Sequence, residues 1–259
     1  MPRTLPFLVS VPHGGDQIPG EIAEKIVLTR HDIFWDSDAF TRQIYGVSDL
    51  VDGFIEASVA RAGVDLNRAE DDLPPANPDG VVKRKTCLAV DLYERGALPT
   101  AADTQSLIEQ HYRPYHSRLR ELCSQEGLEL AFDCHSMLSA GPAIGPDPGS
   151  RRPLLCISNR DGQTSSMALL EGIRDVFAEA FGLSVGDIGV NDPFKGGYIT
   201  RTYGNAPLPW IQVEMNRDLY LSPPWFDPET LEMDPTRLTD LNARFRQALS
   251  EIDRLGLTR

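Results

Sequence analysis

The chain has 259 residues and a formal net charge of −13 at pH 7, with 41% hydrophobic and 24% charged residues. This length suits one large α/β domain or two small ones, and the composition is ordinary for a globular protein. The acidic balance argues against a nucleic-acid-binding surface. We see no apolar run of membrane-spanning length and expect no signal peptide, so neither nucleic acid nor a membrane is an expected partner. The oligomeric state is left open.

The cysteines are scattered, with no C-x-x-C spacing. Such spacing predicts neither a zinc ribbon nor a disulfide framework, and it fits the reducing conditions of the cytoplasm, where we expect the protein to be. The four positions are Cys87, Cys123, Cys134 and Cys156.

Apolar periodicity predicts strands that alternate with helices. Strands are expected over residues 5–11, 53–60, 128–132, 154–158 and 210–214. Helices are expected over residues 22–29, 37–45, 106–125 and 165–181, with a last helix capped by Asp234. Alternation of this kind implies a sheet covered by helices on both faces. We find no repeat and no internal linker, and therefore predict a single domain over residues 1–259.

The first predicted strand leads into the sequence His13-Gly14-Gly15-Asp16. Two glycines permit a tight turn, and residues i and i+3 of such a turn can converge on one point. His13 and Asp16 could therefore chelate one metal ion. The alternative is a glycine turn that happens to contain a histidine.

A second histidine follows another apolar run, in the sequence Asp133-Cys134-His135. Side chains alternate along a strand, so Asp133 and His135 are expected on one face and Cys134 on the other. His135 could supply a third metal ligand, with Asp133 fixing its ring. Two imidazoles and one carboxylate leave a position open for water, as in catalytic zinc sites. Taken alone, a histidine of this kind is more often structural.

Two further segments carry groups suited to chemistry. An arginine next to an asparagine, as in Asn67-Arg68, suits capture of a carboxylate, although a surface arginine would look the same. Glu214 ends an apolar strand, where a buried charge needs a partner. That partner could be a metal-bound water, for which Glu214 would be the general base, or an ion pair with Arg217 or Arg201.

Taken together, these segments resemble the N-formylglutamate amidohydrolase family, over about residues 7 to 221. The resemblance rests on six sequence blocks in the family's order. They are residues 11–15 (VPHGG), 64–68 (VDLNR), 111–116 (HYRPYH), 133–137 (DCHSM), 196–201 (GGYITR) and 212–217 (QVEMNR). The layout is also distantly similar to that of zinc carboxypeptidases and aspartoacylase.

The resemblance implies a fold of the α/β class, a three-layer α/β/α domain with a mixed central sheet, as in the zinc carboxypeptidases. It implies one zinc ion per chain, held by His13, Asp16 and His135, with Glu214 as the base. Asp16 stands where the carboxypeptidases have a glutamate, so this shorter side chain would need a closer backbone.

The same resemblance implies that Asn67 and Arg68 grip a substrate carboxylate. Arg201 would orient the second carboxylate of a dicarboxylic substrate. Arg61 is the nearest candidate for a catalytic arginine that stabilises the oxyanion, although it lies one residue closer to the Asn-Arg pair than in aspartoacylase, and Arg201 is the alternative. The remaining histidines, including His116, are expected to be structural or to lie at the rim of the site.

The activity implied is zinc-dependent hydrolysis of the formyl amide of N-formyl-L-glutamate, or of a closely related small anionic N-acyl amino acid, to the acid and the amino acid. Hydrolysis of another N-acyl amino acid or amide acid is one alternative. A non-catalytic, metal-dependent dicarboxylate-binding protein is another, but it would not need Glu214. A hydrolase that uses Cys134 or Ser136 as nucleophile fits less well, because Cys134 is expected to face away from His135.

Overall fold

The computed structural model describes residues 3–143, 147–204 and 208–258. Its centre is a six-stranded sheet with the order β2-β1-β3-β6-β4-β5. Strands β2, β1, β3 and β6 are parallel, whereas β4 runs antiparallel to β6 and carries β5 parallel to itself. The strands span Leu5–Val11 (β1), Val51–Glu56 (β2), Leu130–Met137 (β3), Leu155–Ser158 (β4), Ile188–Val190 (β5) and Trp210–Asn216 (β6).

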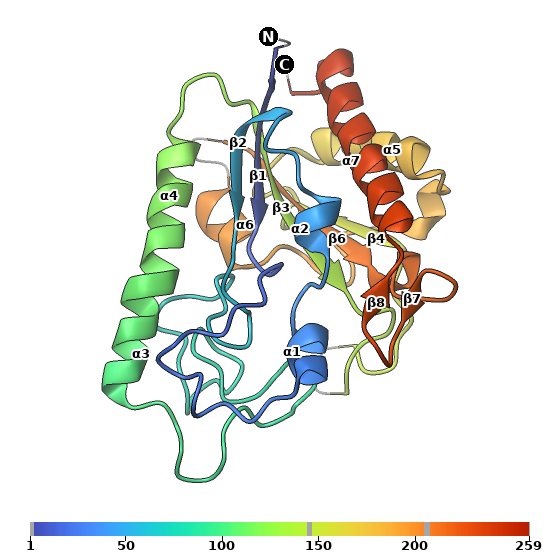
Figure 1. Cartoon of the computed structure of the whole chain (residues 1–259). Coiled ribbons are helices and arrows are strands. Elements are labelled where there is room, and N and C mark those ends of the chain that lie inside the picture. The colour runs from blue at the N-terminus through green and yellow to red at the C-terminus, as the bar shows by residue number, and fades with distance from the viewer. Residues whose placement is uncertain (1–2, 144–146, 205–207, 259) are drawn as a thin grey trace.

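Helices cover both faces of this sheet (Figure 1). Helices α3, α4 and α6 lie on one side, and α2, α5 and α7 lie on the other. The predicted three-layer α/β/α architecture with a mixed sheet is therefore confirmed. The helices span Arg30–Asp36 (α1), Thr41–Ile44 (α2), Ala101–Leu107 (α3), Arg113–Cys123 (α4), Met167–Phe181 (α5), Tyr198–Tyr203 (α6) and Pro235–Leu255 (α7), and a small hairpin of β7 (Phe226–Asp227) and β8 (Glu232–Met233) precedes α7.

Helix prediction was wrong in the segment after the first strand. Residues 22–25 form turns, Ile26 pairs with Tyr93 in an isolated bridge that holds the backbone extended, and residues 27–29 have no regular structure. Helix α1 begins only after Thr29, whose side chain and that of Asp32 form a capping box. The predicted helix over 37–45 is reduced to α2, because Phe40 has a positive φ of 64° immediately before it.

The long helix predicted over 106–125 is divided, as its internal proline suggested. A π-helical segment, Ile108–Tyr112, separates α3 from α4. Pro114 is the second residue of α4, in the first turn, where its missing N–H and its ring are tolerated. No described helix has both the length and the apolar character that crossing a bilayer requires.

The two faces of the sheet differ, and this difference positions the site. Strand residues that face α5 and α7 are apolar, apart from Ser136 near the end of β3. On the opposite face the residues are apolar at first, with Leu8, Ala131 and Trp210, and then become polar toward the carboxyl ends of the strands. There, strand pairing sets Ser10, Asp133 and Gln212 in one row and His135 and Glu214 in the next. Parallel strands end at the same edge, so these polar groups gather in one place.

Candidate active site

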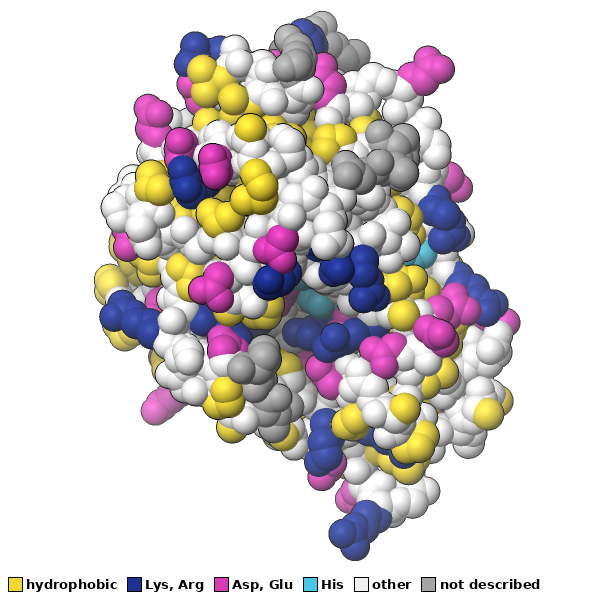
Figure 2. Space-filling view, turned by 180° about the vertical axis from the view of Figure 1, so that it is seen from behind, with side chains coloured by type: hydrophobic (Ala, Val, Ile, Leu, Met, Phe, Trp, Pro, Cys, Tyr) yellow, Lys and Arg dark blue, Asp and Glu magenta, His cyan; other side chains and the backbone are white. Residues whose placement is uncertain are grey.

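A cavity of about 680 Å³ opens at the carboxyl ends of the strands. The space-filling view shows a hollow in this region, with Lys and Arg side chains gathered around it (Figure 2). The lining contains His13, Asp38, His135 and Glu214 at its polar floor. Its cationic lining residues are Arg61, Arg68, Arg152, Lys195, Arg201 and Arg217. The protein is acidic overall, yet six cationic side chains face this cavity, beside five carboxylates, which are those of Asp38, Asp65, Asp72, Asp79 and Glu214.

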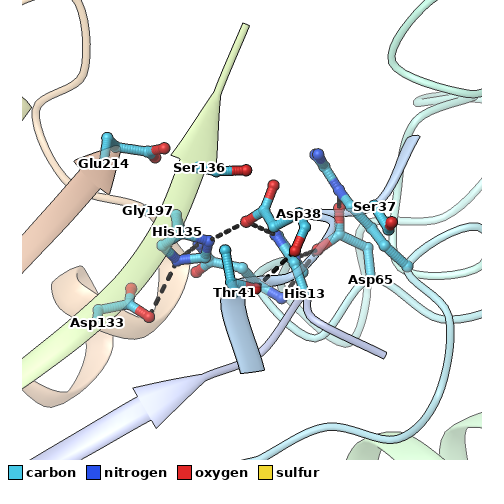
Figure 3. A network of polar contacts seen from close by, with 12 residues as sticks. His13, Ser37, Asp38, Thr41, Asp65, Asp133, His135, Ser136, Gly197 and Glu214 are labelled. Atoms are coloured by element: carbon cyan, nitrogen blue, oxygen red, sulfur yellow. Dashed lines mark hydrogen bonds and ion pairs between the residues drawn. The ribbon is translucent and has the colours of Figure 1, made fainter. Parts of the chain in front are cut away.

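The floor of the cavity is built around three buried side chains, His13, Asp38 and His135 (Figure 3). Oδ2 of Asp38 lies 3.1 Å from Nδ1 of His135 and 3.5 Å from Nδ1 of His13. One candidate ligand atom from each of the three lies within 4.8 Å of the others. Two imidazole nitrogens and one carboxylate oxygen that converge in this way could hold a metal ion.

The other nitrogen of each imidazole faces its own buried carboxylate. Nε2 of His13 lies 2.7 Å from Oδ1 of Asp65, and Nε2 of His135 lies 3.0 Å from Oδ1 of Asp133. A carboxylate beside Nε2 favours the proton on that nitrogen and leaves the Nδ1 lone pair free. Both free lone pairs then face Asp38. The expectation that Asp133 and His135 share one face of a strand is confirmed by this contact.

The buried charges of the cluster shift one another's pKa values. Burial opposes ionisation of Asp38, but hydrogen bonds and charge interactions with His13 and His135 outweigh it and hold its pKa well below the usual range. Asp65 has a lowered pKa for the same reason, with His13 and Arg61 outweighing burial. Burial opposes protonation of His135, but Asp133 and Asp38 raise its pKa well above the usual value. Asp38 and Asp65 are thus kept ionised, as cation binding requires, whereas His135 must release a proton before its Nδ1 can bind a cation.

The carboxylate in the cluster differs from the predicted one. Asp16 is exposed and lines a separate cavity of about 450 Å³ with Gly14 and Arg42, so the structure does not bring it to the two histidines. Asp38 lies there instead, just after α1, and its backbone N–H donates to the carbonyl of His13. One weak signal is present in the sequence, an acidic pair at Asp36 and Asp38, but the helix predicted over 37–45 obscures it.

Glu214 lies beside the cluster on the neighbouring strand β6, directly opposite His135 in the register (Figure 3). Its Oε1 accepts a hydrogen bond of 2.8 Å from Nε2 of Gln212. Burial, together with the nearby Asp38 and Asp133, raises the pKa of Glu214 to about 7, although His135 opposes the shift. Among the described residues no ion pair involves Glu214, and Arg217, one expected partner, binds Asp38 instead. A carboxylate with a pKa near neutrality is suited to exchange protons.

The predicted substrate-binding pair reaches the cavity, where most of its polar groups already have partners, although the buried Nε of Arg68 makes no hydrogen bond in the described structure. Oδ1 of Asn67 accepts from the backbone N–H of Ile199 at 2.7 Å, and its amide nitrogen lies 3.2 Å from Nε2 of His135. Nη2 of Arg68 donates to Asp79 at 2.7 Å. A Cβ on Gly197 would lie only 2.3 Å from the Asn67 amide, so glycine is needed for this close approach.

The two other predicted arginines also line the cavity but differ in their surroundings. Nε of Arg61 donates to Oδ2 of Asp65 at 3.0 Å, which ties this arginine to the partner of His13. Arg201 is exposed, its guanidinium lies 5.6 Å from the ring centroid of Tyr198, and none of the ion pairs found in the described part of the chain includes it. Arg201 therefore remains available for a ligand carboxylate.

His116 is structural, as expected. Its Nδ1 lies 2.9 Å from the hydroxyl of Tyr203, and its Nε2 lies 2.9 Å from the carbonyl oxygen of Leu66. Burial lowers its pKa to about 4, so the ring is neutral. In that state it ties the segment just before Asn67 to α4 and α6, outside the cavity lining.

The α/β fold places an imidazole–carboxylate cluster and a buried glutamate with a pKa near neutrality at the carboxyl ends of its strands. These are the groups that a hydrolase uses to bind a metal ion and to transfer protons. Comparison with known proteins gives the family. The sequence profile of the family described as N-formylglutamate amidohydrolase matches residues 5–221. The chain belongs to this family.

Curated relatives and a solved structure agree with the family assignment. The chain is 30% identical over 226 residues to the N-formylglutamate deformylase of Pseudomonas putida, covering 84% of this chain and 82% of the relative. It is 28% identical over 231 residues to the protein of the same name from Pseudomonas aeruginosa, with the same coverage. The crystal structure of N-formylglutamate amidohydrolase from Ralstonia eutropha JMP134 superposes with a TM-score of 0.76 at 22% identity, covering 97% of this chain and 95% of that one, which supports the fold.

Proposed function

We propose that the chain is a zinc-dependent amidohydrolase that cleaves the formyl amide of N-formyl-L-glutamate, or of a closely related N-formyl amino acid, to formate and the amino acid. The observation that carries the proposal is the convergence of His13, Asp38 and His135 beside Glu214 in a cavity lined by arginines. Membership of the family and the names of the curated relatives supply the substrate class.

The donor set fits a single zinc ion per chain. His13 and His135 would bind through Nδ1 and Asp38 through Oδ2, while Asp65 and Asp133 hold the two rings. Three protein ligands of this kind leave a position for water, and four buried carboxylates within or next to the cluster offset the charge of a divalent cation. Zinc bound there would lower the pKa of a water molecule and polarise a carbonyl group.

Glu214 is the proposed general base. With a pKa of about 7 it can take a proton from the attacking water and return it to the leaving amine as the C–N bond breaks. The formyl carbon then leaves as formate and the nitrogen as the free amine, so that one water is consumed for each amide cleaved. The hydrogen bond from Gln212 holds one carboxylate oxygen and leaves the other free for these transfers.

Three arginines are proposed to bind the negative charges of the oxyanion and of the two substrate carboxylates. Arg61 is better placed than Arg201 to stabilise the oxyanion, because it bonds Asp65, the partner of His13. Arg68, positioned beside the fixed Asn67, would bind the carboxylate next to the amide. Arg201, which has no carboxylate partner in the described residues, would bind the side-chain carboxylate of the substrate.

The alternatives are less well supported. Cys134 belongs to the apolar core on the far face of the sheet, and burial raises its pKa well above the usual value, so it is not a nucleophile for this cavity. Ser136 accepts a hydrogen bond from Arg217 rather than facing a histidine base. A binding protein without turnover would have no use for the buried carboxylate of Glu214. Hydrolysis of a different small N-acyl amino acid remains the second candidate.

A formate-release assay coupled to metal analysis tests this proposal. Purified protein should contain about one zinc per chain, lose activity after treatment with a strong chelator, and regain it when zinc is added back. N-formylglutamate should be cleaved faster than N-acetylglutamate, since only a formyl group leaves the attacked carbon unsubstituted. Full activity of metal-free protein would contradict the zinc mechanism, and no formate release from any N-formyl amino acid would contradict the substrate class.

A further inference from the structure

We propose that Arg217 is a positioning residue that fixes the carboxylate of Asp38 toward the two histidines and thereby sets the metal affinity of the site. This inference rests on the proposed metal-dependent function. It concerns a residue outside the predicted ligand and substrate-binding sets. The sequence alone had suggested Arg217 as a partner of Glu214, and the structure gives it a different one.

Arg217 begins the short 3₁₀ segment after β6 and is buried, with its side chain only 6% exposed. Its Nη2 donates to Oδ1 of Asp38 at 3.1 Å and to the carbonyl oxygen of Ser37 at 2.6 Å. Its Nη1 donates to the carbonyl oxygen of Trp35 at 3.0 Å. The guanidinium thus binds the carbonyl groups of Trp35, near the end of α1, and of Ser37, directly after it, together with the side chain of Asp38.

The same side chain also reaches the other ligand-bearing strand. Nε of Arg217 donates to Oγ of Ser136 at 3.0 Å, and Ser136 directly follows His135. One planar group therefore ties the segment that carries Asp38 to the strand that carries His135. These segments lie far apart in the sequence, so their relative placement depends on contacts of this kind.

The bond to Asp38 determines which oxygen is free. Oδ1 is occupied by Arg217, so Oδ2 is the atom that lies near both Nδ1 nitrogens. A carboxylate held by one oxygen presents the other in a fixed direction and loses less rotamer freedom when a cation binds. Lysine could keep the positive charge, but a single ammonium group cannot reproduce four bonds in a planar fork.

The test is zinc affinity of the full chain, measured by competition with a chromophoric chelator. Loss of a hydrogen-bonding partner behind a metal ligand typically costs about 10–100-fold in affinity, and we expect a loss in this range for Arg217→Lys. The matched control is Arg152→Lys. Arg152 is another cavity-lining arginine with a 6% exposed side chain, but it forms its bidentate pair with Asp147 and touches none of the proposed ligands. Its replacement should leave zinc affinity within about twofold.

A double-mutant cycle shows whether Arg217 acts through Asp38. In an Asp38→Asn background the further effect of Arg217→Lys on zinc affinity should shrink to about twofold or less, because the bond it removes has lost its charged partner. Additive effects would overturn the proposal, as would a folded Arg217→Lys protein with unchanged affinity or an equal loss in Arg152→Lys. If Arg217→Lys does not unfold cooperatively, Ser136→Ala replaces it. That variant removes one anchor of the guanidinium and should weaken zinc binding several-fold, and unchanged affinity would overturn the proposal.

Failure of this inference is distinguishable from failure of the proposed function. Zinc binding is measured without substrate, so a wild-type protein that binds zinc but releases no formate would contradict the function and leave the role of Arg217 open to the same test. A wild-type protein that cleaves N-formylglutamate while Arg217→Lys keeps full zinc affinity would contradict only the role of Arg217. A wild-type protein that binds no zinc would overturn this role whatever its activity.

Discussion

Nδ1 of His135 lies 3.1 Å from Oδ2 of Asp38, although the two residues are separated by 97 positions in the sequence. The contact joins the central strand β3 to the segment that follows α1. Because of this contact, the carboxylate that can share a cation with the histidines is that of Asp38. It is not that of Asp16, which lies closer to His13 in the sequence. The choice between these two aspartates is open to direct experiment.

Replacing Asp38 with Asn should weaken zinc binding strongly but measurably, because the amide oxygen is neutral and a poorer ligand for zinc. Asp16→Asn is the matched control, since it makes the same change at an exposed site in a separate cavity. Chelator competition with both variants measures the effect. Loss of zinc in Asp16→Asn with binding retained in Asp38→Asn would restore the ligand set predicted from the sequence.

The sequence was sufficient for the parts of the site that depend on local pattern. His13 after the first strand and the alternation of Asp133 with His135 follow from strand geometry alone, and the structure brings these three groups together. Glu214 was found in the same way, as a polar residue at the end of an apolar strand. For such residues the neighbours along the chain already determine the direction of the side chain.

Asp38 could not be found in this way, because its position depends on long-range contacts. The bonds that hold it come from Arg217, far along the sequence, and from the backbone of the His13 segment. The prediction of a helix over residues 22–29 was wrong for a related reason. Its apolar spacing is compatible with a helix, but Ile26 is held extended by a bridge to Tyr93, a tertiary contact that overrides local preference.

Removal of the proposed base should separate chemistry from metal binding. Glu214→Gln keeps the size of the side chain but cannot accept a proton, and loss of a general base typically lowers the rate by about 10²–10⁴-fold. We expect kcat to fall by this factor while zinc content stays near that of the wild type. An unchanged kcat would show that Glu214 has no part in proton transfer.

The pH dependence of kcat/KM should report Glu214. The base must be ionised, so activity should fall as the pH falls through its pKa, which is about 7 without bound cation and which a nearby cation should lower. Gln212→Met removes the N–H that donates to Oε1 and so removes a stabilisation of the ionised form. The pKa of Glu214 should rise and the acid limb should move to higher pH. A limb that stays in place would mean that another group controls it.

Substrate selectivity should divide between the two proposed carboxylate-binding arginines. N-formylglutamate and N-formylglutamine share the carboxylate next to the amide and differ in the charge at the end of the side chain. If Arg201 binds the side-chain carboxylate, Arg201→Gln should raise KM for N-formylglutamate by about tenfold, the lower end of the range for a charged hydrogen bond, because its guanidinium is exposed and screened. KM for N-formylglutamine should change little.

Arg68 is expected to behave differently, because the carboxylate that it would bind is common to both substrates. Arg68→Lys should therefore weaken the binding of both substrates, since a lysine cannot replace the planar fork that also bonds Asp79.

For Arg201→Gln, the control for charge alone is Lys195→Gln, which removes a cation from the same cavity wall. Lys195 is already paired with Asp161 at 2.8 Å, so its loss should alter KM for either substrate less than Arg201→Gln alters KM for N-formylglutamate. Equal losses for both substrates in Arg201→Gln would show that Arg201 acts on the oxyanion or supports the cavity wall, and the side-chain carboxylate would then need a different partner.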